Sequence, residues 1–272
     1  MCILFIYRNP NPSKGGYKLI IASNRDEYYA RPAKLAHYWE DDPGCLGGMD
    51  MEPGREGGTW LALNYESGRA GVLLNLNGTP RSLVGKGRGF LVKDYITSED
   101  SSMKHAEKLH KVNQETQCYN PHNLVMIDLR TSDVLYLSSI SNYPGPKVLD
   151  KRIMGFGNSG IEHPYQKVIN GEREFEKIVI NASTSHQESL IENLIEFLRK
   201  EKRYLPDDEL KKRSPEAFEE LSAIFVEHKT SKYGTRTHSI ILVDDSNQLT
   251  FVEQTLIEDG VWKQQIFTNH LQ

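Results

Sequence analysis

The second residue of the chain, Cys2, is the side chain best placed to do covalent chemistry. Removal of Met1, which a small second residue permits, would leave Cys2 with both a thiol and a free α-amine. An α-amine titrates near pH 8 and a thiol near pH 8.5, so the amine could accept the proton of the thiol. Such a pair could attack an amide or ester carbonyl and form a thioester for water to hydrolyse. The alternative is that Cys2 is a small apolar residue that starts an edge strand.

A second polar group, Ser23-Asn24-Arg25-Asp26-Glu27, follows the apolar run Leu19–Ala22. We interpret this position as the end of a strand, where sites are commonly built. Asp26 could hold the α-amine of Cys2, and Arg25 supplies a fixed cation for a carboxylate or phosphate. The alternative is a solvated turn with a local ion pair. We favour a functional interpretation, because several such residues next to a buried strand are costly unless they are satisfied.

The elements that must position these residues are mainly paired strands. Apolar or alternating runs come in pairs that are joined by turn-forming residues, which predicts antiparallel hairpins. The predicted pairs are Cys2–Tyr7 with Tyr17–Ala22, Thr59–Leu63 with Arg69–Asn75, Leu124–Leu129 with Val134–Ser138, and Ser239–Val243 with Leu249–Glu253.

Helical periodicity accompanies the hairpins, most clearly in Glu188–Arg203, where apolar residues repeat at helical spacing opposite Glu and Lys. The other predicted helices are Gly87–Thr97, Ser102–Val112 and Tyr165–Ile180. Clustered hairpins and helices predict an α+β fold. We interpret the polar stretch Tyr204–Pro215 as a surface loop and the whole of residues 1–272 as a single domain.

Composition narrows the function. The 33 Lys+Arg against 37 Asp+Glu show no electrostatic footprint for nucleic acid. Three scattered cysteines, Cys2, Cys45 and Cys118, argue against a disulfide framework and for a reducing compartment. The metal-site spacings Cys-x-x-Cys and His-Glu-x-x-His are absent, so we predict no metal site. With no apolar run near 18 residues and no signal peptide, we expect a cytoplasmic chain that is not secreted and has at most peripheral membrane contact.

Met-Cys-Ile at the start together with Asn24-Arg25-Asp26-Glu27 resembles the signature of the transport and Golgi organisation 2, or NRDE, family. Further blocks are similar to family blocks and follow in the family's order, so that the resemblance covers essentially the whole chain. These are Arg31-Pro32, Glu56-Gly57-Gly58-Thr59-Trp60, Gly87-Arg88-Gly89, Gly157-Asn158-Ser159 and Tyr233-Gly234-Thr235-Arg236-Thr237.

The family is in turn similar to the cysteine N-terminal-nucleophile (Ntn) hydrolases, such as penicillin V acylase and bile salt hydrolase. This resemblance implies an αββα sandwich of two mainly antiparallel sheets between helical layers. It implies that Cys2 is the nucleophile and that Asp26 orients the amine. Asn75, Asn158 and Arg236 match further site residues; the asparagines could stabilise an oxyanion, and Arg236 could lower the thiol pKa. The two asparagines could equally be turn formers at strand ends.

One departure from the hydrolases concerns charge. They carry an arginine three residues before the aspartate, where this chain has Ser23, and Arg25 stands next to Asp26 instead. A catalytic cation is thus lost or relocated, and hydrolysis does not follow from the scaffold.

The segment Gly85–Gly89, with Lys86 and Arg88, begins a predicted helix and could bind a phosphate or propionate group. The alternative is a solvated basic turn.

The resemblance implies roles in haem trafficking, in Golgi and secretory organisation, and in lipid or acyl-coenzyme A handling, with mitochondrial or Golgi association left open. Our leading hypothesis is a carrier of a lipophilic, acid-bearing ligand, haem first and acyl-coenzyme A second, which meets Asn24, Arg25, Glu27, Arg88 and Arg236. Such a carrier requires no cofactor, takes haem as cargo and would meet proteins that donate or accept it. Axial ligands for haem would come from scattered groups such as His37, His163, His238, Tyr28 or Tyr29. The alternatives are a cysteine amidohydrolase or thioesterase that uses Cys2, and a structural adaptor.

Overall fold

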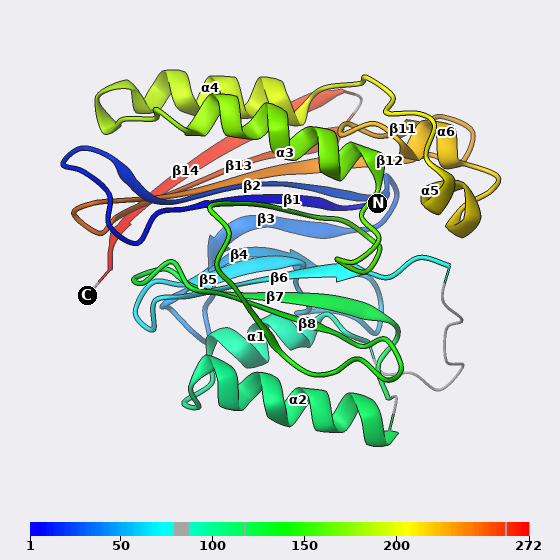
Figure 1. The fold of residues 1–272 in the computed structure, drawn as a ribbon, viewed down its shortest axis with the longest axis horizontal. Helices are drawn as coiled ribbons and strands as arrows, with labels where there is room; N and C mark the ends of the chain where they lie inside the picture. The colour runs from blue at the N-terminus through cyan, green and yellow to red at the C-terminus, as the bar shows by residue number, and fades with distance from the viewer. Residues whose placement is uncertain (79–86, 117, 259, 272) are drawn as a thin grey trace. The chain divides into compact units, whose positions relative to one another are not determined.

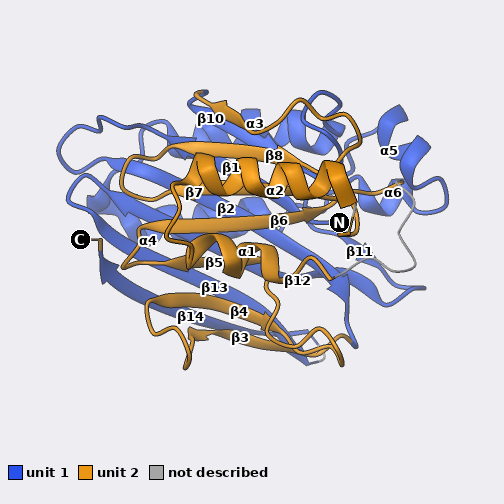
Figure 2. Ribbon diagram, turned by 90° about the horizontal axis from the view of Figure 1, so that it is seen from below, with its two compact units in different colours: residues 1–30, 151–270 blue, residues 31–150, 271–272 orange. Residues whose placement is uncertain are grey.

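The computed structural model describes residues 1–78, 87–116, 118–258 and 260–271. The chain forms two compact units, one of residues 1–30 and 151–270 and the other of residues 31–150 and 271–272 (Figure 2). Each unit contains a seven-stranded sheet in which every pairing is antiparallel, together with helices. The predicted α+β class is therefore confirmed, while the Ntn-type layering of two sheets stays a prediction.

The sheet of the first unit has the order β10-β1-β2-β12-β13-β14, and β11 pairs with β12 (Figure 1). The strands are β1 (Ile3–Arg8), β2 (Tyr17–Tyr28), β10 (Ile153–Phe156), β11 (Glu227–His228), β12 (Tyr233–Asp244), β13 (Gln248–Glu258) and β14 (Val261–His270). The helices are α3 (Gln166–Val179), the short 3₁₀ turn η1 (Thr184–His186), α4 (Gln187–Leu198), α5 (Asp208–Arg213) and α6 (Phe218–Leu221).

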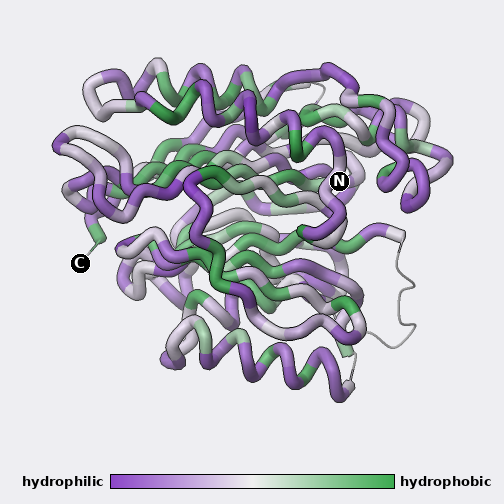
Figure 3. The backbone as a smooth tube through the Cα atoms, in the orientation of Figure 1, coloured by the Kyte–Doolittle hydropathy of each residue, from purple (hydrophilic) through white to green (hydrophobic). Residues whose placement is uncertain are grey.

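Helices α3 and α4 cover one face of this sheet, α3 over β1 and β10 and α4 over β2 and β12. The core between them contains Phe5 of β1, whose ring lies 5.7 Å from that of Phe175 and 5.0 Å from that of Phe197. At Gly171 a Cβ would stand 2.4 Å from the Phe5 ring, so α3 approaches the sheet this closely only because residue 171 is glycine. Figure 3 shows the alternation of hydrophilic and hydrophobic residues along these helices. None of the described helices is long and apolar enough to cross a lipid bilayer.

The sheet of the second unit has the order β3-β4-β5-β6-β7-β8-β9. Helix α1 packs on β5 and β6, and α2 packs on β8. The elements are β3 (Ala33–Tyr38), β4 (Cys45–Asp50), β5 (Leu61–Asn64), β6 (Arg69–Asn75), α1 (Phe90–Ile96), α2 (Ser102–Thr116), β7 (His122–Asp128), β8 (Val134–Ser138) and β9 (Lys147–Leu149).

All four predicted hairpins are confirmed by the registers of β1–β2, β5–β6, β7–β8 and β12–β13. The predicted helix over Glu188–Arg203 forms but ends at Leu198. The prediction of a surface loop over Tyr204–Pro215 was wrong, because this stretch contains α5 and buries Tyr204 and Leu210 in the core. Its two prolines lie outside the helix, so they do not prevent it from forming.

Candidate functional site

The signature segment Asn24–Glu27 lies inside strand β2. The prediction that it follows a strand end was wrong: β2 continues to Tyr28, because β12 pairs with it along its full length. Thr235 stands opposite Asp26, and Thr237 opposite Arg25. Strand pairing satisfies the backbone here, and each side chain must therefore point to one face of the sheet or the other.

The two faces of the sheet hold different groups. Asn24 lies on the helix-covered face, since its amide donates to the carbonyl oxygens of Leu198 and Ile224, at 2.8 and 3.0 Å. Side chains alternate along a strand, so Asp26 shares this face, and Ser23 and Arg25 lie on the opposite face. Ser23 is buried and its hydroxyl donates to the Ile3 carbonyl at 2.9 Å.

Cys2 lies on the face of Arg25. The register Ile3↔Asn24, continued by one residue, sets Cys2 beside Arg25, and the Cys2 thiol lies 3.9 Å from the Asp26 carbonyl oxygen. Asn158 lies in a bend two residues beyond the end of β10. Asn158 is buried. Desolvation is the main effect that raises the pKa of the Cys2 thiol, and the charges of the N-terminal amine and of Arg25 oppose it. In this form of the chain the thiol is mostly protonated at neutral pH.

Arg236 reaches the site through an irregularity in β12. The register with β2 shifts between Thr235 and Thr237, so Arg236 is the extra residue of a β-bulge opposite Asp26 and Arg25. Bulges next to sites commonly re-aim one side chain. The Arg236 side chain is 9% exposed and donates to the Tyr28 carbonyl at 3.1 Å. Arg25 is 6% exposed and lies 4.0 Å from a carboxylate oxygen of Glu27.

On the helix-covered face, Asp26 holds the N-terminal amine of the chain. With Met1 present, this amine is that of Met1, and it lies 3.2 Å from Oδ2 of Asp26. The same amine donates to the hydroxyl of Tyr233, which in turn donates to the backbone carbonyl of Asp26 at 3.2 Å. Thr235 donates to Oδ1 of Asp26 at 2.7 Å. Burial lowers the pKa of the amine, and the charge of Asp26 counteracts this effect.

Lys167 of α3 is a charged residue that the sequence did not predict for this site. Its side chain is fully buried, and its Nζ donates to the Ala223 carbonyl at 3.0 Å. Desolvation lowers the pKa of Lys167, and the charge of Asp26 counteracts this effect. Within the helical pattern of α3 a lysine indicates a solvent-facing position, so no sequence signal could have found it. Tyr233 and Thr235 belong to a block that the resemblance singled out, but it gave them no role.

Asn24 acts as a link between strands and helix. Its Oδ1 lies 2.7 Å from Nδ1 of the fully buried His238. Because the amide group of Asn24 donates to two carbonyls, its oxygen must accept, and His238 carries its proton on Nδ1. Burial lowers the pKa of His238 to about 3, so the ring is neutral. The ring also stacks on Trp262 of β14 at 4.5 Å.

Two further predicted residues, Asn75 and Arg88, belong to the second unit. Asn75 is the last residue of β6, in register with His122, and Arg88 donates to the Pro121 carbonyl at 2.7 Å just before α1. Their relation to Cys2 stays a prediction, and Gly85 and Lys86 lie outside the described residues. Among the residues suggested for haem, Tyr28 is 56% exposed, and Nδ1 of His37 lies 2.8 Å from the Leu35 carbonyl.

Comparison with known proteins places the chain in a family. Residues 1–258 match the family model described as Transport and Golgi organisation 2. The chain is similar to Transport and Golgi organization protein 2 of Drosophila melanogaster, with 41% identity over 94% of this chain and 92% of that protein. The homolog of Mus musculus is 36% identical over 95% of this chain and 94% of its own length. The homolog of Homo sapiens is 34% identical over the full length of both.

Proposed function

Since this chain belongs to the transport and Golgi organisation 2 family, we propose that it serves transport and Golgi organisation as a carrier of a lipophilic, acid-bearing ligand. Haem is the first candidate for the cargo and acyl-coenzyme A the second. The ligand binds on the Cys2 face of β1, β2 and β12, with its anionic group at Arg25 and Arg236.

The observation that supports this proposal is a pair of buried guanidinium groups on the neighbouring strands β2 and β12, with Arg25 next in register to Cys2. Arg25 and the bulge residue Arg236 are each less than a tenth exposed, and a guanidinium stays charged even when buried. Glu27, 4.0 Å from Arg25, is the carboxylate partner of this pair of cations, and the Tyr28 carbonyl accepts a hydrogen bond from Arg236. A carboxylate or phosphate ligand would share this charge through paired hydrogen bonds.

The protonation of the site favours binding over hydrolysis. The pKa of the Cys2 thiol is raised, whereas a nucleophilic thiol needs a lowered pKa or an adjacent base. The buried amine that Asp26 holds is that of Met1, not of Cys2. Ser23 occupies the position at which the hydrolases carry their arginine. A chain that retains Met1 is thus equipped to hold a ligand and poorly equipped to cleave one.

Titration of haem, followed by absorbance, and of a long-chain acyl-coenzyme A, followed by calorimetry, tests the carrier. We expect Arg25→Ala and Arg236→Ala each to weaken binding of the true cargo by about tenfold or more, because each removes a charge-assisted contact. Arg173→Ala, which changes an exposed arginine of α3, is the matched control and should bind as the wild type does. Unchanged affinity of both site variants for both ligands would rule out this binding face.

A cysteine amidohydrolase or thioesterase is the second candidate, and the contacts of Asp26 favour it. The carboxylate of Asp26 already binds an N-terminal amine and the Thr235 hydroxyl, which is what an amine-bearing Cys2 would need after loss of Met1. A thiol-reactive acyl probe should then label Cys2 in protein that lacks Met1, and Cys2→Ser should abolish the labelling. If intact mass spectrometry finds no acyl adduct on Cys2 of the Met1-free protein, hydrolysis is excluded.

A further inference from the structure

A groove of about 810 Å³ lies on the helix-covered face of the first unit, between α4 and the strands β13 and β14. We call it the α4 groove. Helix α4 packs on β2 and β12, and the sheet continues beyond them by β13 and β14. The floor is formed by Gln254 of β13 with Gln264 and Ile266 of β14, and Ile266 is 53% exposed. Two strands about 5 Å apart leave a strip roughly as wide as one helix.

The wall of the α4 groove is acidic. Glu188, Glu192 and Glu196 line it and are all exposed. They are spaced four residues apart, so they form one row with a repeat of about 6 Å along the helix. None of the three carboxylates forms an ion pair within the part of the chain that the structure describes. Glu188 stabilises α4, because an acidic side chain in the first turn interacts favourably with the helix dipole. Glu192 and Glu196 destabilise the helix instead, because like charges four residues apart repel each other.

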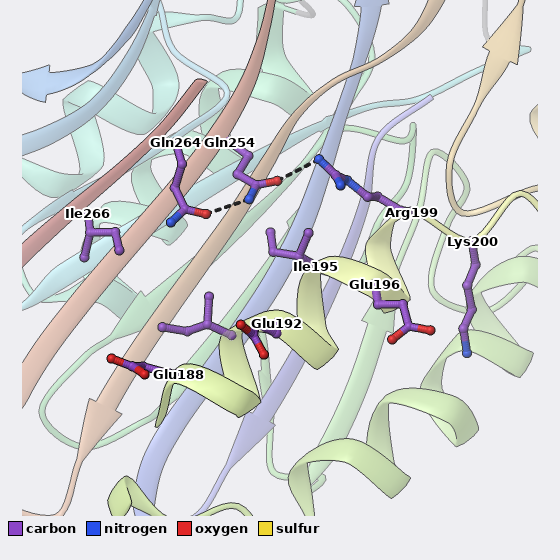
Figure 4. A pocket seen from close by; sticks show the side chains of 10 residues that line it. Glu188, Glu192, Ile195, Glu196, Arg199, Lys200, Gln254, Gln264 and Ile266 are labelled. Atoms are coloured by element: carbon purple, nitrogen blue, oxygen red, sulfur yellow. Dashed lines mark hydrogen bonds between the residues drawn. The ribbon is translucent and has the colours of Figure 1, made fainter. Parts of the chain in front are cut away.

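The groove is held in place by its own hydrogen bonds. Arg199, next to the last residue of α4, donates to the Gln254 side chain at 3.0 Å, and Gln254 donates to that of Gln264 at 2.6 Å. Figure 4 shows these bonds crossing from the helix to both strands, with Ile195 and Ile266 facing the same space. Lys200, at the same end, is bound to Glu174 at 2.7 Å. The cations of the groove are thereby engaged, whereas its acids have no partner in the described chain.

We propose that the α4 groove docks a basic amphipathic helix of a partner protein. Its apolar face packs on Ile191, Ile195 and Ile266, and lysine or arginine residues four positions apart pair with Glu188, Glu192 and Glu196. Two parallel helices have the same repeat, so each basic residue meets one carboxylate. The row of glutamates repels the phosphates of an anionic membrane and of nucleic acid, which leaves a basic protein segment as the complementary partner.

The test uses the full chain and a fluorescein-labelled 18-residue peptide of stated design. The peptide carries leucine at helical spacing on one face and lysines at i, i+4 and i+8 beside it; a second peptide has glutamate in place of each lysine. Fluorescence anisotropy measures binding, and circular dichroism measures helix gained by the peptide. We expect the lysine peptide to bind as a helix and the glutamate peptide not to bind.

Two triple variants with the same change in net charge separate the groove from general electrostatics. In the groove variant, Glu188→Lys/Glu192→Lys/Glu196→Lys, the affinity for the lysine peptide should fall by at least about tenfold. This variant should also bind the glutamate peptide, which the wild type does not. Glu40→Lys/Glu107→Lys/Glu216→Lys, at exposed sites elsewhere, should keep the wild-type preference. The single variant Ile266→Glu, made in the otherwise wild-type chain, should abolish binding of the lysine peptide. Thermal melts confirm that each variant is folded.

Three results would overturn the proposal. One is absence of lysine-peptide binding to the wild type, and another is equal loss of affinity in both triple variants, which would show that net charge alone attracts the peptide. The third is binding without a gain of helix, which would indicate pairing of an extended peptide with the edge of β14. The experiment leaves Cys2, Arg25 and Arg236 unchanged, so its failure would not bear on the proposed carrier function.

Discussion

His238 shows how one buried side chain makes the stability of the protein depend on pH. Burial lowers its pKa to about 3 in the folded chain, whereas an unfolded histidine titrates near 6.5. Between these two values the unfolded chain binds a proton that the folded chain does not. The contribution of His238 to stability is therefore fully present above about pH 6.5 and is lost as the pH falls towards 3.

We predict that replacing His238 removes this part of the pH dependence of the free energy of unfolding. His238→Gln keeps a donor for Oδ1 of Asn24 but does not titrate. Urea unfolding should find the variant less stable than the wild type at pH 7, and this difference should shrink by about 3 kcal/mol between pH 7 and pH 4, because only the wild type pays for the buried neutral ring. A difference in the free energy of unfolding that stays constant with pH would contradict the prediction.

At the scale of single residues, the sequence could indicate only those side chains whose chemistry and position beside an apolar run are both visible locally. The hairpin expected from Cys2–Tyr7 and Tyr17–Ala22 brings Cys2 next to the signature segment of β2, while the roles expected for Arg25 and Asp26 towards a ligand and the Cys2 amine stay predictions. Lys167 and the proton on Nδ1 of His238 were not predictable, because they depend on contacts with carbonyl and amide groups far away in the chain. Asn24 was expected to meet a ligand, which stays a prediction; in the structure its amide group binds the end of α4 and His238.

At the scale of elements, one carboxylate caps two helices. Asp207 accepts from the backbone N–H of Leu210 in α5 at 2.9 Å and, with its other oxygen, from that of Gln166 at the start of α3 at 2.6 Å. It is 5% exposed. Each helix begins with N–H groups that have no partner within the helix, so Asp207 fixes the start of α3, the helix that carries Lys167.

Replacing Asp207 should therefore destabilise two elements at once. We expect Asp207→Ala to cost about 2 kcal/mol or more in urea unfolding, roughly one cap for each helix. Asp207→Asn should cost about half as much, because its oxygen can still accept from Leu210 while its NH₂ group faces the N–H of Gln166. Asp208→Ala, at the exposed neighbour, is the control and should change stability by a few tenths of a kcal/mol. Similar losses for Asp207→Ala and Asp208→Ala would refute the double cap.

Helices and strands were predictable where the local sequence pattern determines them. They were not predictable where pairing with a distant strand determines them. The four hairpins followed from turn residues between apolar runs. The extension of β2 through Asn24–Glu27 depends on β12, which is more than 200 residues away in the chain, and polar residues alone indicate the end of a strand. The bulge at Arg236 has no local signal either, since it arises from the mismatch between these two long strands.

At the scale of the whole molecule, the first residue joins the site to the hydrophobic core. The Met1 side chain is 3% exposed and belongs to the core cluster that contains Ile3 and Val226, against which Tyr233 packs. Its amine binds Asp26, and its peptide bond occupies the nitrogen that would otherwise be the free amine of Cys2. We therefore expect removal of Met1 to change both the stability of the fold and the reactivity of the Cys2 thiol.

These two effects should be measurable in opposite directions. Protein released from an N-terminal fusion so that it begins at Cys2 should be less stable by about 2 kcal/mol, because a buried methionine is lost from the core. Its thiol should react with iodoacetamide at pH 7 about tenfold faster than in the Met1-containing form, since a cationic amine on the same residue lowers the thiol pKa. Mass spectrometry that resolves each cysteine supplies the rate, and the rate at Cys118 serves as the internal reference. Equal rates at Cys2 in the two forms would mean that Met1 does not control the thiol, and the raised pKa would then have to come from the surrounding sheet alone.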